Sequence, residues 1–99
     1  MTQEKLKYPI GKYEKQGTIT REIMTLLIND ISSFPLRLTM EVIHLSDKQL
    51  NTPYRSGGWT IRQVVHHCAD SHMNALRRLK LTLTENKPIV KPYKEERWA

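Results

Sequence analysis

The stretch GWTIRQVVHHCADSHMN, residues 58–74, places three histidines and one aspartate inside a single predicted helix. Thr60 and Gln63 have the spacing of a capping box, which marks the start of a helix. Apolar residues then recur at intervals of three and four as far as about Leu83. The sequence therefore predicts a helix over 60–83, and this helix carries most of the side chains in the chain that could do chemistry.

A second helical pattern precedes this one, over residues 20–45. Its apolar residues recur at intervals of three and four, which marks one face of a helix: Ile23, Met24, Leu27, Ile28, Ile31, Phe34, Leu38, Val42 and Leu45. Thr18 or Thr20 can cap its start. Pro35 lies inside the pattern, and because proline removes a backbone donor and clashes with the preceding turn, we expect this helix to kink there or to divide.

The remaining segments have weaker patterns. Residues 1–18 show no sustained period and are interpreted as an irregular arm, and residues 46–50 predict a short helical turn. A loop with proline and paired glycines follows at 51–58, and residues 84–99 are interpreted as an extended tail or a linker. The predicted fold class is all-α, with two long helices in a single domain.

Composition is that of one small domain, since 38% of the 99 residues are hydrophobic and 26% are charged. So short a chain is expected to need a partner, a ligand or a second copy to cover its apolar faces. The net charge of +6 is spread along the chain, without a basic stripe or a zinc-finger pattern, so no nucleic acid is expected as partner.

The cysteine content and the lack of a long apolar segment suggest a cellular location. A single cysteine, Cys68, excludes an intramolecular disulfide and fits a reducing compartment. The sequence has no apolar signal region and no long apolar run, so a membrane partner is not expected. We therefore expect a soluble, cytoplasmic protein.

The three histidines of the predicted helix point in different directions. At 100° per residue, His72 falls in the middle of the apolar face, His67 on its shoulder, and His66 away from it beside Asp70. Histidines that chelate one ion from a helix are three or four residues apart. The separations here are one, five and six residues, so the helix can supply one ligand but not a complete metal site.

Each histidine has an alternative to metal binding. His66 is expected to be a solvent-exposed side chain paired with Asp70, and His72 a hydrogen-bonded core histidine. The position of His67 suits both an inward-projecting ligand and a polar residue at the rim of a bundle, and position alone leaves these open. Asp70 follows His67 by three residues, so it could be a ligand itself or could orient the imidazole.

Other side chains near this stretch have simpler interpretations. Cys68 lies within the apolar arc and is expected to be a buried, inert thiol. Trp59 is expected to act as a hydrophobic staple before the helix cap, and Arg78 shares a side with His67 and could hold an anionic group. The sequence has no glycine-rich phosphate loop, no Ser-His-Asp arrangement and no Cys-x-x-Cys motif.

Four motifs of the chain, taken in order and at their separations, are informative together. They are Tyr8-Pro9-Ile10-Gly11-Lys12-Tyr13, Thr52-Pro53-Tyr54-Arg55, Gly57-Gly58-Trp59-Thr60 and Val64-Val65-His66-His67-Cys68-Ala69-Asp70-Ser71-His72-Met73-Asn74. These motifs resemble the N-terminal half of the YfiT-type members of the DinB superfamily. The match extends over nearly the whole chain, through Lys91-Pro92-Tyr93 to Trp98.

This resemblance implies a four-helix bundle, usually dimeric, that acts as a metal-dependent hydrolase or, in some relatives, as a thiol S-transferase using bacillithiol. It implies one divalent metal ion, zinc or nickel, held by three histidines. The first ligand maps onto His67, which leaves His66 and His72 as weaker candidates and Asp70 as a residue beside the ligand. The other two belong to a late His-x-x-x-His pair that this sequence does not contain. We therefore expect an incomplete domain that is inactive alone.

Two functions remain open at this stage. The first is a metal-dependent hydrolase or thiol S-transferase with a small-molecule substrate. For this function the sequence indicates a metal ligand but no other catalytic residue. The second is a non-enzymatic helical module that completes a bundle as a homodimer, because two amphipathic helices cannot cover both of their apolar faces alone.

Overall fold

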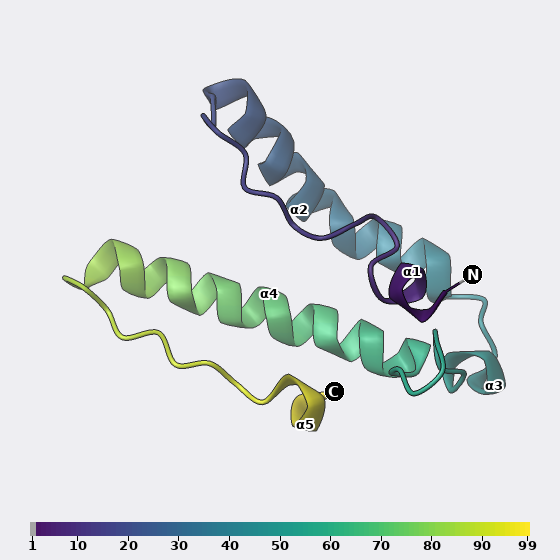
Figure 1. Cartoon of the computed structure of the whole chain (residues 1–99). Helices are drawn as coiled ribbons and strands as arrows, with labels where there is room; N and C mark the ends of the chain where they lie inside the picture. The colour runs from purple at the N-terminus through teal and green to yellow at the C-terminus, as the bar shows by residue number, and fades with distance from the viewer. Residues whose placement is uncertain (1) are drawn as a thin grey trace. The chain divides into compact units, whose positions relative to one another are not determined.

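The computed structural model describes residues 2–99, and these form helices and no strand (Figure 1). The helices are α1 (Gln3–Lys7), α2 (Arg21–Val42), α3 (Asp47–Leu50), α4 (Ile61–Thr84) and α5 (Glu95–Trp98). The predicted all-α class with two long helices is confirmed. The chain divides into two compact units, Met1–Leu50 and Asn51–Ala99, which are described separately below.

In the first unit, α2 begins and ends close to the predicted bounds of 20–45. Of the two threonines that could cap it, Thr20 is the one that does, since its hydroxyl accepts a hydrogen bond from the Ile23 N–H at 3.2 Å. The cap satisfies one of the free N–H groups of the first turn. The helix ends at Val42, three residues before the last apolar residue of the pattern.

Pro35 does not divide α2, which continues through it as one helix. Proline leaves the carbonyl one turn earlier without its usual donor. Arg37 adds side-chain hydrogen bonds in this region. Its guanidinium donates to the Asp30 carbonyl at 2.9 Å and to the Ser33 hydroxyl at 3.1 Å. Of the two expected consequences of Pro35, division is therefore wrong, whereas a kink stays a prediction.

The N-terminal arm is less irregular than predicted, because α1 forms within it. The Thr2 hydroxyl caps this helix by accepting a hydrogen bond from the Lys5 N–H. Lys12 lies 3.8 Å from the Glu4 carboxylate and 5.0 Å from the centre of the Tyr8 ring. A helix of this length leaves almost no periodic signal in the sequence, so only its cap could have indicated it. Met1 lies outside the described residues.

In the second unit, α4 begins at the predicted capping box. The Thr60 hydroxyl accepts from the Gln63 N–H at 3.1 Å, and the Gln63 side chain accepts from the Thr60 N–H at 3.0 Å. The preceding loop is closed by a bridge between Pro53 and Thr60 and by the Ile61 N–H, which donates to the Thr52 carbonyl at 3.1 Å. The loop and the first turn of α4 therefore form one hydrogen-bonded structure.

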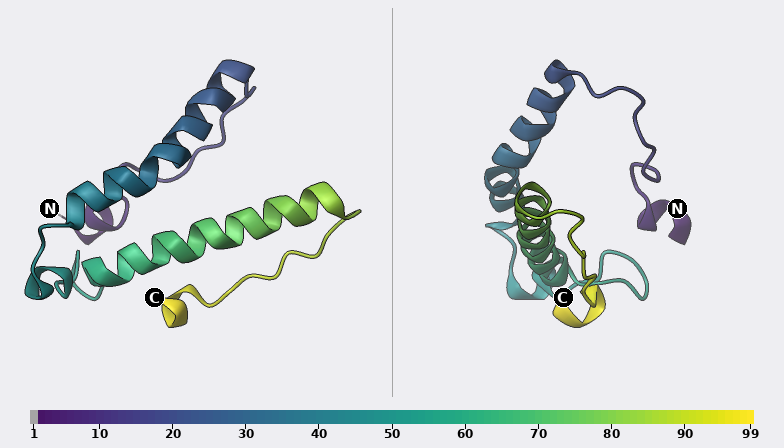
Figure 2. Two further views of the ribbon diagram at one scale, coloured as in Figure 1. Left: turned by 180° about the vertical axis from the view of Figure 1, so that it is seen from behind. Right: turned by 90° about the vertical axis from the view of Figure 1, so that its left-hand side faces the viewer.

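After α4 the chain reverses and returns beside it as the tail, residues 85–99. Lys87 takes a positive φ of 52° in the reversal, and Pro88 follows it. The tail then runs back along α4 as an extended segment and ends in α5, which contacts α4 (Figure 2). The tail was predicted to be extended, and α5 is the exception within it.

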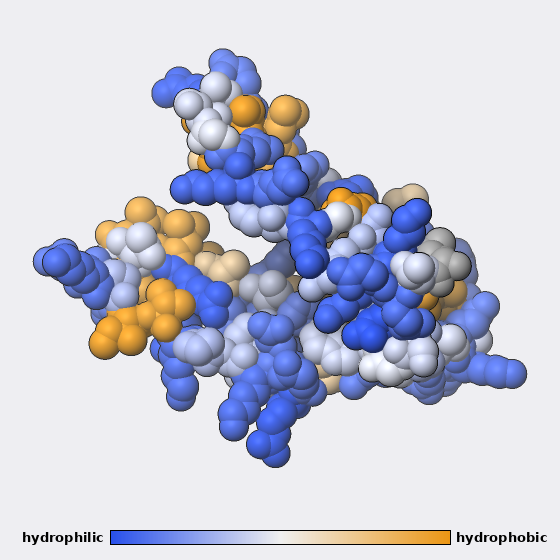
Figure 3. Space-filling model, in the orientation of Figure 1, coloured by the Kyte–Doolittle hydropathy of each residue, from blue (hydrophilic) through white to orange (hydrophobic). Residues whose placement is uncertain are grey.

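None of the described residues is fully buried. The half-buried residues in the middle turns of α4 include His67, Asp70 and Asn74, and Asn74 lines the hollow beside the tail. The apolar face is more open toward the end of the helix, where Leu76, Leu79 and Leu83 are 54%, 56% and 76% exposed. Orange, apolar surface is visible at that end of α4 in Figure 3. No helix within residues 2–99 is long and apolar enough to cross a membrane.

Candidate functional site

His67 lies half-buried on α4, with the indole ring of Trp59 against it. The two ring centroids are 4.9 Å apart and the ring planes are tilted by 58°. Trp59 immediately precedes the cap of α4, and its carbonyl accepts a hydrogen bond from the Tyr54 N–H at 3.0 Å. The loop therefore holds the indole in place, and the indole restricts the orientations open to the imidazole.

Asp70 follows His67 by almost one turn and is also half-buried. The backbone carbonyl of Asp70 accepts a hydrogen bond from the side-chain amide of Asn74 at 2.8 Å. Asn74 is on the same side of the helix as His67, two turns further on. These three polar residues thus form a half-buried row on one side of α4.

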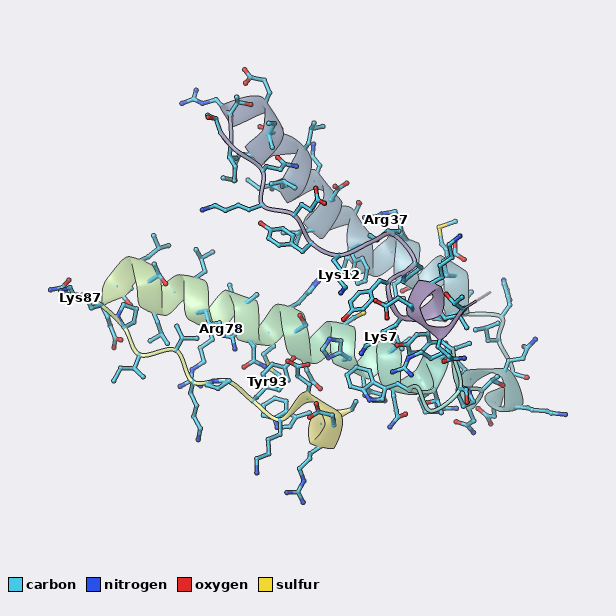
Figure 4. The ribbon with its side chains drawn as sticks, in the orientation of Figure 1. Lys7, Lys12, Arg37, Arg78, Lys87 and Tyr93 are labelled. Carbon is cyan, nitrogen blue, oxygen red and sulfur yellow. The ribbon has the colours of Figure 1, made fainter. Side chains whose placement is uncertain are left out.

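The tail brings Tyr93 toward this row, and both Tyr93 and Arg78 of α4 are labelled in Figure 4. Partial removal from water raises the pKa of Tyr93, and the negative charges of Glu95 and Asp70 raise it further, while Arg78 acts in the opposite direction. Asp70 and Arg78 are therefore close enough to act on the Tyr93 hydroxyl. The sequence had indicated Arg78 as an anion-holding residue but gave no signal that Tyr93 would lie near it.

The other two histidines of α4 are exposed. For His66 this agrees with the interpretation of a solvent-exposed side chain. For His72 the predicted core environment is wrong within the described residues, because the tail covers the polar shoulder of α4 and not the apolar face around His72.

Cys68 is half-buried and unpaired. Burial raises the pKa of its thiol, so less of it is present as the reactive thiolate than in an exposed cysteine. This agrees with the predicted inert thiol. Its removal from water is only partial, since the side chain keeps some exposure.

The residues of the second unit do not by themselves fit a complete metal centre. Among residues 2–99, no group of three or more histidine, cysteine, aspartate or glutamate side chains is arranged to hold a metal ion. Structural and catalytic zinc sites take at least three protein ligands. His67 with Asp70 nearby can therefore form only part of such a site.

Comparison with known proteins identifies the family. Residues 36–99 match the model of the DinB superfamily. A protein of Bacillus mycoides (strain KBAB4), named "Putative metal-dependent hydrolase", is 55% identical over 94 residues, which make up 95% of this chain and 54% of the relative. A protein of Oceanobacillus iheyensis with the same description is 56% identical over 93 residues, or 94% of this chain and 54% of the relative.

A solved structure is similar as well. YfiT from Bacillus subtilis, described as "a probable metal-dependent hydrolase with an unusual four-helix bundle topology", is 49% identical and superposes with a TM-score of 0.91. The superposition covers 95% of this chain and 54% of YfiT. The chain thus spans about half the length of the relatives that it matches. On the family match over more than half of its residues, this chain belongs to the DinB superfamily.

Proposed function

We propose that this chain carries one histidine ligand, His67, of a metal-dependent hydrolase. The observation that supports His67 most directly is its contact with Trp59, because a metal-binding imidazole needs a fixed ring orientation. His66 and His72 are exposed, whereas His67 is half-buried. The names of the relatives, which describe metal-dependent hydrolases, support the class of reaction.

The metal proposed is a single zinc or nickel ion. Imidazole nitrogen is a good ligand for both, and a three-histidine site would leave positions for water and substrate. The remaining ligands are proposed to come from outside the described residues, because residues 2–99 hold no group of three or more histidine, cysteine, aspartate or glutamate side chains placed to bind a metal ion. Asp70 is proposed to orient the imidazole rather than to bind the ion, since it follows His67 by three residues on the same helix.

Substrate and location are proposed more broadly. The proposed substrate is a small molecule. The alternative to hydrolysis is the transfer of a thiol to the substrate, which is proposed because the sequence resembles a family that includes bacillithiol-dependent transferases. The single unpaired cysteine supports a reducing compartment, the cytoplasm. A homodimer is proposed on the same resemblance.

The test is metal analysis of the protein extended to the length of its relatives. We expect about one zinc or nickel ion per chain, and a loss of most of it in His67→Ala. His66→Ala is the matched control, because it removes the neighbouring imidazole from an exposed position, and it should leave the metal content unchanged. Unchanged metal in His67→Ala would remove this residue from the site.

A second function is favoured by a different observation, the open apolar face at the end of α4. Leu76, Leu79 and Leu83 form an exposed apolar stripe. Contact of such a surface with water is unfavourable in free energy, so its burial by a partner would be stabilising. We propose, as the alternative, that the 99 residues act as a helical module that completes a bundle with a second copy. Sedimentation of the 99-residue chain tests this, because a stable folded monomer at micromolar concentration would contradict it.

A further inference from the structure

The tail and α4 border an open cavity of about 520 Å³ in the second unit. Asn74 and Arg77 line it from α4. The tail supplies the other lining residues, Lys91, Pro92, Tyr93, Lys94, Arg97 and Trp98. Its volume is within the usual range for small-molecule sites, about 300–1,000 Å³. The cavity lies entirely within one compact unit, so its shape depends only on how the tail packs on α4.

Positive charge dominates the lining. Arg77, Lys91, Lys94 and Arg97 are cationic at neutral pH, and no acidic residue lines the cavity. Cations gathered around a hollow raise the local concentration of anions and favour their binding. Two of the four are arginines, which bind carboxylate and phosphate oxygens with paired hydrogen bonds.

The cavity also has an aromatic wall. The rings of Tyr93 and Trp98 are 4.8 Å apart between centroids and tilted by 54°, so they support each other at one side of the hollow. Such a pair offers flat apolar surface to a ligand. Asn74 adds a polar group on the α4 side, although its amide already donates to the Asp70 carbonyl.

Three acidic residues lie near the cavity without lining it. Glu95 and Asp70 act on the Tyr93 hydroxyl, and their charges offset part of the positive potential. Glu96 lines a different hollow, together with Arg55 and Trp59. The four cations therefore remain the charged groups that a molecule inside the cavity would meet first.

We propose that this cavity binds a small organic anion with two negative charges and a flat apolar body, such as an aromatic phosphate monoester or dicarboxylate. The cations would hold the charged end, and Tyr93 and Trp98 would contact the body. Asn74 follows His67 by seven residues, which places it about 10 Å further along the helix and on the same side. An extension of the proposal rests on the proposed function: the anion is the end of a substrate whose other end reaches His67.

Binding itself is tested first, with the metal chelated so that the result does not depend on His67. Phenyl phosphate is titrated into the protein at mildly alkaline pH, where the phosphate is a dianion. We expect saturable binding by calorimetry and a change in tryptophan fluorescence that persists in Trp59→Phe, in which Trp98 is the only tryptophan. Benzyl alcohol, of similar size and without charge, should not bind. Equal binding of both ligands, or of neither, would overturn the proposal.

Inorganic phosphate and phthalate, used as further ligands, distinguish the contribution of the negative charge to affinity from that of the flat aromatic body. Phthalate should bind like phenyl phosphate, because it carries two charges on a flat ring. Inorganic phosphate should bind at least about tenfold more weakly, because it lacks the body that contacts the aromatic wall. If inorganic phosphate binds as tightly as phenyl phosphate, the aromatic part of the proposal is wrong.

Variants then locate the site. Arg77→Gln combined with Arg97→Gln removes two lining cations, and we expect at least about a tenfold rise in the Kd of phenyl phosphate. Lys80→Gln combined with Lys87→Gln removes the same charge from residues of the second unit that do not line the cavity, and it should leave the Kd unchanged. An equal rise in both double variants would mean that net charge alone attracts the anion, which would overturn the site. The His67→Ala variant distinguishes the two proposals. Loss of its metal would support the proposed function, and anion binding that persists in the same variant would show that the cavity binds the anion without the metal.

Discussion

The indole of Trp59 lies against the imidazole of His67, with the ring centroids 4.9 Å apart. The two residues are separated by the capping box of α4, so the contact joins the loop before the helix to its second turn. The sequence predicts Trp59 to be a hydrophobic staple that fixes the entry of the loop into the helix. Its contact with the proposed ligand gives this loop a direct connection with the site.

Replacement of this indole should release the imidazole. We expect Trp59→Ala to lower the stability of the second unit by about 1 kcal/mol, the contribution typical of an aromatic pair. The ring protons of His67 should also lose the shielding that a neighbouring indole produces, and their NMR shifts measure this. The ring protons of exposed His66 serve as the internal control. Unchanged His67 shifts in Trp59→Ala would contradict the contact.

Removal of the α4 cap should weaken the helix at its start. Thr60→Ala leaves the Gln63 N–H without its side-chain acceptor, and we expect a loss of about 1 kcal/mol. The temperature at which far-UV ellipticity is lost should fall accordingly. Thr18→Ala is the matched control, because Thr20 and not Thr18 caps α2, and it should change this temperature little. A similar fall in both variants would argue against the cap.

The loop before α4 should tolerate side chains poorly at its glycines. Gly57 has a φ of 71°, so Gly57→Ala should cost about 1 kcal/mol through backbone strain. At Gly58 an added Cβ would lie 2.6 Å from the Arg55 Cγ and 3.2 Å from the Arg55 carbonyl oxygen, which requires a shift of Arg55. Gly17→Ala is the control, because nothing lies within 4 Å of its Cβ position. Thermal loss of ellipticity again compares the three variants, and equal stability of all three would contradict this account of the loop.

Cys68 should react slowly in the folded protein and faster after unfolding. Burial raises the pKa of its thiol, so the folded state holds the proton more tightly than the unfolded state does. The resulting stability is fully present below the pKa of the unfolded thiol, about 8.5, and is lost as pH rises through the higher folded pKa. The rate of alkylation by iodoacetamide, measured with and without urea, checks the difference. Equal rates would show that the thiol is not shielded.

The parts of the fold that the sequence predicted are those with a local cause. The helix over 60–83 has its cap, its period and its stop within its own residues, and α4 follows them almost to the residue. The start of the helix over 20–45 is also predicted, although the sequence left Thr18 and Thr20 open as its cap and the structure selects Thr20. In contrast, α1 and α5 are too short to show a period, and α1 depends on a cap by Thr2 alone.

The path of the tail could not be predicted, because it depends on contacts between residues far apart in the sequence. The periodicity of α4 identifies its apolar face. It does not indicate on which face of the helix the tail packs. The tail follows the polar shoulder instead, so His72 is exposed and Asn74 is half-buried. His67 was named as a candidate ligand from the resemblance, and its role stays a prediction. The nearness of Tyr93 and Trp98 to Asn74 required the structure.

The absence of any fully buried side chain among residues 2–99 has a calorimetric consequence. Heat-capacity changes on unfolding come mainly from apolar surface that becomes hydrated, and here much of that surface is hydrated already. The 99 residues alone should therefore melt gradually, with a small heat-capacity change and a shallow dependence on urea. Any molecule that covers the end of α4 should bind with a negative heat-capacity change and turn this gradual melting into a sharp transition.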